Sequence, residues 1–168
     1  AGAATRPDPA RVSRFQRGVC LAHVNDLTRG YASAPARATL DYLKTLGVDA
    51  ISVTPFGFSR TPADPQVGFV LDSPGSETDS QMLAILAAAR VRGISVLYKP
   101  HIWVGEGGWA GRIEMPDEAA WKRFFEGYRR FAVHHALLAA EGGASGFVVG
   151  TEMARSSFRA DDWRSVIA

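Results

Sequence analysis

The chain has 168 residues, of which 46% are hydrophobic and 21% charged, and its formal net charge is +2. That length fits one domain with a sizeable core, and the charges form no basic stripe of the kind that binds nucleic acid. Its apolar runs are much shorter than the roughly 20 residues that cross a bilayer, so we expect no membrane contact. The single cysteine, Cys20, excludes an internal disulfide, and its apolar surroundings predict a small buried side chain.

Hydrophobic patterning predicts an alternation in which each strand is followed by a helix. The expected strands are short apolar and β-branched runs, whereas the expected helices repeat apolar residues every three or four positions. In chain order, the strands are predicted at 17–24, 49–56, 94–104 and 145–151, and the helices at 33–47, 78–93, 116–143 and 159–168. The second strand is expected to break at Pro55 and the third to stop near Pro100.

Local signals support these helix boundaries. Ser33 is suited to cap the first helix and Pro35 to its first turn. Thr78 and Gln81 have the spacing of a capping box at the start of the second helix. The third helix carries an aromatic stripe at helical spacing, which is expected to pack in the core: Trp121, Phe124, Phe125, Tyr128 and Phe131. His135 falls on the same apolar face and is also expected to be a core residue.

Two segments are predicted to be loops. The connection 57–77 is rich in Pro, Gly and Asp, and connections of this length are usually functional or mobile. The stretch "GEGGWAG" at 105–111 is rich in glycine and carries Trp109.

Apolar strands that alternate with helices indicate an α/β protein with a parallel sheet covered by helices. Two architectures fit: an open doubly wound sheet, or half of a (β/α)8 barrel. A nucleotide-binding open sheet would carry G-x-G-x-x-G or a phosphate loop after its first strand. This chain reads "HVNDLTRGYASAP" there, and "GEGGWAG" does not lead directly into a helix. We therefore expect no nucleotide and no other cofactor.

Polar and aromatic residues gather at the C-terminal ends of the predicted strands. These ends form the functional face in both architectures, and the opposite ends carry ordinary surface residues. In chain order, the residues at the C-terminal ends are His23, Asn25 and Asp26, then Thr54, Phe56 and Phe58, then Lys99, His101 and Trp103, and finally Thr151 and Glu152.

Aromatic rings beside a carboxylate point to a carbohydrate substrate. Aromatic faces stack on sugar rings, polar side chains bind the hydroxyls, and glycoside hydrolysis needs a general acid and a second carboxylate. We expect Glu152 to be the acid/base. The residues expected to bind the substrate are Asn25, Phe56, Lys99, His101, Trp103, Trp109 and Thr151.

Six segments in this order resemble the glycoside hydrolase TIM-barrel-like proteins near glycoside hydrolase family 113, a β-mannanase family of clan A: "GYAS", "TPFGF", "ETDSQM", "KPHIWV", "GGWAGRI" and "VVGTE". The resemblance runs from about Arg17 to the C-terminus. It implies a (β/α)8 TIM barrel and a retaining mechanism on a β-linked polysaccharide such as mannan. The family acid/base lies at the end of strand four, where Glu152 matches, and the nucleophile at the end of strand seven has no counterpart here. Many clan A enzymes carry Asn before the acid/base, where this chain has Thr151.

A (β/α)8 barrel typically needs about 250 residues, so we expect the chain to cover the first four β/α units. Residues 1–16 would be an N-terminal extension and 17–168 the N-terminal half of the barrel. Four strands leave open edges, and the expected partner is a C-terminal half-barrel, in the same polypeptide or a second chain. The 168-residue chain alone is expected to be inactive. Its small-residue start is typical of a processed exported protein, although a recombinant chain could begin in the same way.

Two other functions stay open at this point. A metal-dependent hydrolase could use His23, His101, Glu152 and Glu77 as ligands, but the H-x-H pair such barrels often carry is absent from the first strand. A non-catalytic carbohydrate-binding or structural barrel module would keep the aromatic residues and lack a working nucleophile.

Overall fold

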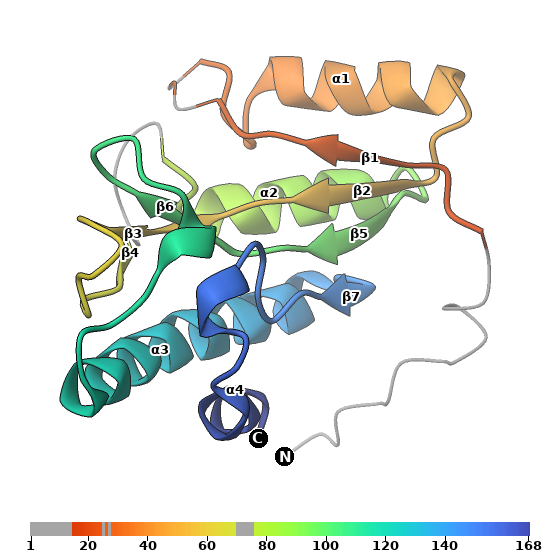
Figure 1. Cartoon of the computed structure of the whole chain (residues 1–168). Coiled ribbons are helices and arrows are strands. Elements are labelled where there is room, and N and C mark those ends of the chain that lie inside the picture. The colour runs from red at the N-terminus through yellow and green to blue at the C-terminus, as the bar shows by residue number, and fades with distance from the viewer. Residues whose placement is uncertain (1–14, 25, 27, 70–75) are drawn as a thin grey trace.

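The computed structural model describes residues 15–24, 26, 28–69 and 76–168. Its main sheet is parallel and has the spatial order β1-β2-β5-β7, so neighbouring strands follow chain order without a reversal (Figure 1). An open doubly wound sheet reverses its order at a switch point, whereas a barrel does not. The strands are β1 (Gly18–Leu21), β2 (Ala50–Val53), β5 (Ser95–Tyr98) and β7 (Gly146–Phe147).

A helix follows each strand of this sheet, as the sequence predicts. The helices are α1 (Ala34–Thr45), α2 (Asp79–Arg90), α3 (Glu118–Gly142) and α4 (Ala160–Ile167). The predicted caps are confirmed: Ser33 Oγ accepts the Ala36 N–H at 3.1 Å, and Thr78 Oγ1 accepts the Gln81 N–H at 3.4 Å. Within the described residues, none of the helices has both the length and the apolar character needed to span a bilayer.

Prolines divide the second and third predicted strands. After Pro55 and Pro100 the chain forms β3 (Phe56–Ser59) and β6 (His101–Val104), which pair in parallel, and β4 (Gly68–Phe69) adds an antiparallel edge to β3. The pair β2–β5 before the prolines and the pair β3–β6 after them have the same register. Pro55 and Pro100 therefore lie opposite each other. The predicted breaks at Pro55 and Pro100 are confirmed, because proline has no N–H to donate to the ladder, and the structure adds that both strands resume beyond the prolines. The predicted loop 57–77 also contains strand residues.

The fourth predicted strand, 145–151, is much shorter in the structure. Only Gly146–Phe147 is paired, against β5, and the Val148 N–H then donates to the Tyr98 carbonyl at 2.9 Å. Beyond this point the chain leaves the sheet and enters a short 3-10 turn, η3 (Ala154–Ser156). β7 pairs with a strand on one side only, so fewer backbone hydrogen bonds stabilise it than stabilise the central strands β2 and β5.

The core lies between the helices and one face of the main sheet. Ile51, Val53 and Tyr98 pack there against buried residues of the three long helices, such as Leu40 of α1 and Met82 of α2. A second cluster surrounds the aromatic stripe of α3, whose predicted role in packing is confirmed by the burial of Trp121, Phe124, Phe125, Tyr128 and Phe131.

His135 is a core residue, as predicted from its place on the apolar face of α3. It is 3% exposed, and its Nδ1 lies 3.0 Å from the Tyr98 hydroxyl. Burial above all, and the neighbouring His134 to a smaller extent, lower the pKa of His135 to about 4, while Asp79 acts in the opposite direction.

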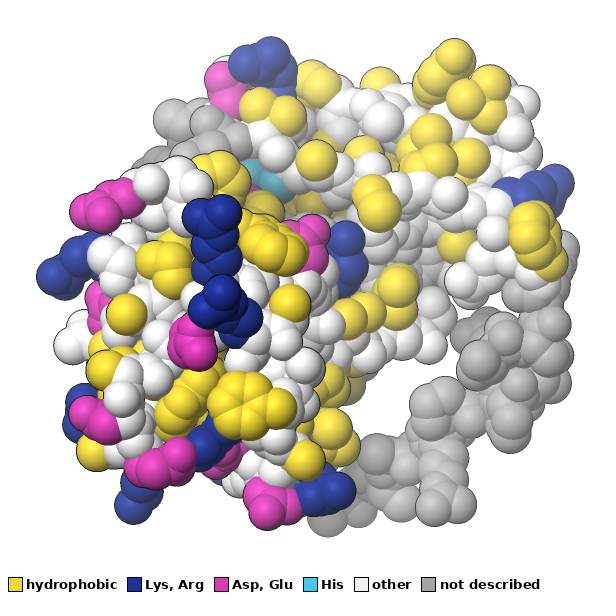
Figure 2. Space-filling model, in the orientation of Figure 1, with side chains coloured by type: hydrophobic (Ala, Val, Ile, Leu, Met, Phe, Trp, Pro, Cys, Tyr) yellow, Lys and Arg dark blue, Asp and Glu magenta, His cyan; other side chains and the backbone are white. Residues whose placement is uncertain are grey.

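Within the described part of the chain, no helix covers the other face of the main sheet, and hydrophobic side chains are spread over this face (Figure 2). Cys20 and Leu97 align there on either side of Ser52, and Leu97 is 41% exposed. Cys20 is exposed, so the prediction that it is buried is wrong. The reason is that β1 is an edge strand, and within the described residues no element packs over its open side.

Candidate active site

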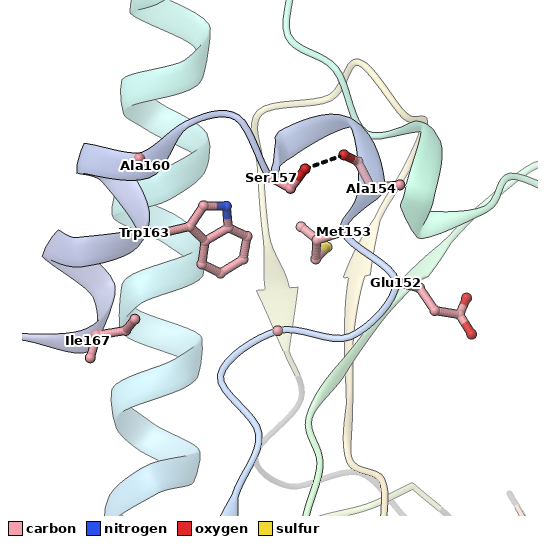
Figure 3. Close-up of a pocket in the computed structure, with 8 residues that line it drawn as sticks. Glu152, Met153, Ala154, Ser157, Ala160, Trp163 and Ile167 are labelled. Atoms are coloured by element: carbon pink, nitrogen blue, oxygen red, sulfur yellow. Dashed lines mark hydrogen bonds between the residues drawn. The ribbon is translucent and has the colours of Figure 1, made fainter.

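Glu152 lies beyond the end of β7 with its backbone in the left-handed region, at φ 57°. This conformation costs a residue with a side chain about 1–2 kcal/mol, and such strain is concentrated at functional sites. The side chain is 52% exposed. Its carboxylate points away from Met153 and Trp163, which face a cavity behind the loop (Figure 3).

Two residues from the third β/α unit meet one oxygen of Glu152. Trp109 Nε1 donates to Oε2 at 2.6 Å, and His101 Nε2 lies 3.6 Å from the same oxygen. His101 Nδ1 is 2.9 Å from the Ile102 carbonyl oxygen, which can only accept, so Nδ1 carries the hydrogen. Nε2 of the neutral ring is then an acceptor, and its contact with Glu152 is attractive when either residue is protonated.

The glycine-rich loop places Trp109 at this carboxylate. A side chain at Gly105 would come within 2.7 Å of the Arg60 carbonyl oxygen, and one at Gly111 would collide with the Trp109 ring itself. The ring therefore lies against a position that only glycine leaves free. Trp109 also precedes the 3-10 turn η2 (Ala110–Arg112), where the Arg112 N–H donates to the Trp109 carbonyl at 2.9 Å.

An aromatic face adjoins the carboxylate on β3 and β6. The Phe56 ring centroid is 5.7 Å from that of His101 and 5.9 Å from that of Trp103, with the Trp103 ring edge-on. Phe58 pairs with Trp103 in register, and these two side chains are 42% and 60% exposed. Side chains two residues apart in a strand lie on the same face. The spacing of Phe56 and Phe58 is therefore the sequence signal for β3, most of which lies in the predicted loop 57–77.

The remaining predicted substrate residues are placed differently. Thr151 is half-buried, and its Oγ1 has no hydrogen-bond partner in the described part of the chain. Lys99 is also half-buried, and its backbone N–H donates to the Val53 carbonyl at 2.9 Å. Lys99 and Glu152 both lie in the described part of the chain, and they form no ion pair with each other. Asn25 lies outside the described residues.

The first strand exit holds a separate group of buried polar residues. His23 Nε2 is 3.9 Å from Glu77 Oε1, and the His23 ring meets Tyr31 edge-on at 4.9 Å. The Tyr31 hydroxyl donates to the Leu21 carbonyl at 2.7 Å and accepts the Thr54 N–H at 3.1 Å, which joins the ends of β1 and β2. This role of Tyr31 is not predicted from the sequence. Among the described residues, no three His, Cys, Asp or Glu side chains are grouped as a metal-ligand set.

A cavity of about 540 Å³ lies behind the Glu152 loop, between η3 and α4. Its walls are mostly apolar, with Met153, Ala160, Trp163 and Ile167 around it (Figure 3). Glu152 also lines this cavity, but its carboxylate points to the other side of the loop, where it meets Trp109.

The sequence model of Glycoside Hydrolase Family 113 matches residues 24–168. This chain belongs to glycoside hydrolase family 113. No curated protein sequence matches it significantly.

Solved structures of family 113 enzymes have the same fold as this family 113 chain. The complex structure of a GH113 β-1,4-mannanase is 24% identical, with a TM-score of 0.80, over 92% of this chain and 51% of the other. The GH113 β-mannanase AaManA from Alicyclobacillus acidocaldarius, in complex with ManMIm, is 25% identical, with a TM-score of 0.81, over 91% and 50%. The chain thus spans about half the length of these mannanases, and the prediction of a partial (β/α)8 barrel is confirmed.

Proposed function

We propose that this family 113 chain carries the acid/base half of a retaining glycoside hydrolase that acts on a β-linked, mannan-like polysaccharide. The observation that supports this function best is the Glu152 carboxylate, which extends from the C-terminal edge of the sheet beside an exposed aromatic face. The C-terminal edge of the strands is where barrel enzymes build their active sites. The similar structures are those of mannanases, which supports mannan as the substrate class.

In this proposal Glu152 acts twice. It first gives a proton to the glycosidic oxygen as the bond to the leaving sugar breaks, and it then takes a proton from the water that releases the covalent intermediate. The nucleophile is a second carboxylate about 5–5.5 Å away, as retaining enzymes require. It would come from a C-terminal half-barrel that covers the open face and edges of the main sheet.

The other predicted residues bind sugar in this scheme. Trp103, which is exposed, and Phe56, which is half-buried, offer ring faces and edges against which pyranose rings can pack. Thr151 and Lys99 would bind hydroxyl groups, and Asn25, which lies outside the described residues, stays a prediction of the same kind. None of these roles requires a cofactor.

The test compares Glu152→Gln with the unchanged protein in the complete barrel, with mannan as substrate. Removing the general acid should lower the turnover rate by about 10²- to 10⁴-fold. Glu106→Gln is the matched control, because Glu106 is also exposed and also left-handed, at φ 55°. Full turnover by the Glu152 variant would refute the assignment. Binding of mannan without turnover by the unchanged barrel would instead favour a non-catalytic binding module.

A further inference from the structure

We infer that Trp109 is a positioning residue for the acid/base: its indole N–H holds Oε2 of Glu152 and leaves Oε1 to carry the proton that is transferred. This inference rests on the proposed function. It assigns a role to the glycine-rich loop, because that loop brings the indole to the carboxylate from a different β/α unit.

The choice of oxygen follows from hydrogen-bond chemistry. An indole N–H can only donate, so the oxygen it contacts at 2.6 Å must accept. In a protonated carboxyl group the carbonyl oxygen is the stronger acceptor, so the indole N–H favours Oε2 as the carbonyl oxygen of the acid form. His101 Nε2 lies 3.6 Å from Oε2, beyond hydrogen-bond distance, and so does not hold a proton on that oxygen. The transferable proton is then carried by Oε1.

The contact restrains a side chain that would otherwise be free to move. Glu152 is half-exposed, and a long carboxylate side chain in solvent samples several rotamers. The indole is rigid, and Gly111 lets its ring lie against the η2 backbone. Holding an acid in one orientation relative to the scissile bond is a large part of the catalytic effect of a positioned group.

The same bond gains strength during the reaction. When Oε1 gives its proton to the glycosidic oxygen, the bond between the sugar carbon and that oxygen breaks and the electron pair leaves with the oxygen. The negative charge that remains is shared by both carboxylate oxygens, so the bond from Trp109 becomes charge-assisted and stronger. An interaction that strengthens as charge develops lowers the barrier rather than only binding substrate.

The test uses two substrates whose leaving groups differ in their need for a proton. Cleavage of a mannan oligosaccharide requires the acid, because the leaving sugar oxygen must be protonated as the bond breaks, whereas a dinitrophenyl β-mannoside releases a stable phenolate and does not need a proton. For Trp109→Phe in the complete barrel, we expect kcat/KM on the oligosaccharide to fall by about 10- to 100-fold, with a much smaller change on the aryl glycoside. Gly111→Ala keeps the N–H but displaces the ring, and the same selective loss is expected.

Trp163→Phe is the matched control. Its indole N–H donates to the Ser156 carbonyl at 2.9 Å, in the apolar region behind the loop. Losing that bond should change stability and leave the ratio of the two kcat/KM values as it was. Any merely structural effect of removing an indole N–H is measured in this way.

Glu152→Gln, assayed on both substrates, separates the two hypotheses. If it shows the selective loss while Trp109→Phe lowers both activities equally or neither, the positioning role is overturned and the proposed function stands. If Glu152→Gln cleaves the oligosaccharide at the full rate, the proposed function fails as well. Selective loss in Glu152→Gln, Trp109→Phe and Gly111→Ala supports both.

Discussion

Lowering the pH should decrease the stability of the folded protein, because His135 of α3 is buried in the core. In the unfolded chain the His135 imidazole has its usual pKa of 6.5, whereas burial in the folded protein lowers the pKa to about 4. Between these values the unfolded chain binds a proton that the folded chain does not, so stability falls as the pH decreases. At 1.36 kcal/mol per pKa unit, the free energy of unfolding should fall by about 3 kcal/mol from neutral pH to pH 4.

The assay is urea denaturation, followed by tryptophan fluorescence, at several values from about pH 7 to pH 4.5. A His135→Leu change alone would strand the Tyr98 hydroxyl, which is fully buried, at a cost of about 1–3 kcal/mol. The comparison is therefore made between Tyr98→Phe and the double variant Tyr98→Phe/His135→Leu. The stability of Tyr98→Phe should still fall as the pH decreases over this range, whereas the stability of the double variant should not show this fall.

Other groups that titrate near this range are kept constant by the comparison. His134 and Asp79 form a 2.8 Å pair beside His135 and are present in both variants. The pKa of Glu118 is held below its usual range by Arg159, so that carboxylate titrates at lower pH. Equal loss of stability in the two variants would refute the assignment of this pH dependence to His135.

Two further changes test the packing and the strand ends. Gly142→Ala would push a methyl group into Leu86, which is 1% exposed, and we expect the free energy of unfolding to fall by about 1–3 kcal/mol in a urea titration. An unchanged urea midpoint would mean that α2 and α3 can separate locally at no cost. Tyr31→Phe removes the buried hydroxyl that joins β1 to β2, and a loss of about 1–3 kcal/mol is expected. A melting temperature equal to that of the unchanged protein would show that this bridge contributes nothing net.

The sequence by itself determined the order of strands and helices and most of the helix boundaries. These depend on interactions between residues a few positions apart: the Ser33 and Thr78 caps, and the spacing of the aromatic residues of α3. It also placed Glu152 beyond the end of a strand, because the apolar run before it is short and ends in small residues. The resemblance to family 113, carried by six short segments, then selected the barrel from the two architectures that the alternation allowed.

The tertiary structure alone decided what depends on contacts between distant residues. Only the pairing of strands shows that Pro55 and Pro100 lie opposite each other, so that both strands are interrupted at one level and resume as β3 and β6. The exposure of Cys20 follows from which strand is at the edge of the sheet, and an apolar run does not encode that. The bond from Trp109 to Glu152 joins residues 43 positions apart. No local pattern predicts such a contact, because it forms only after two β/α units have packed side by side.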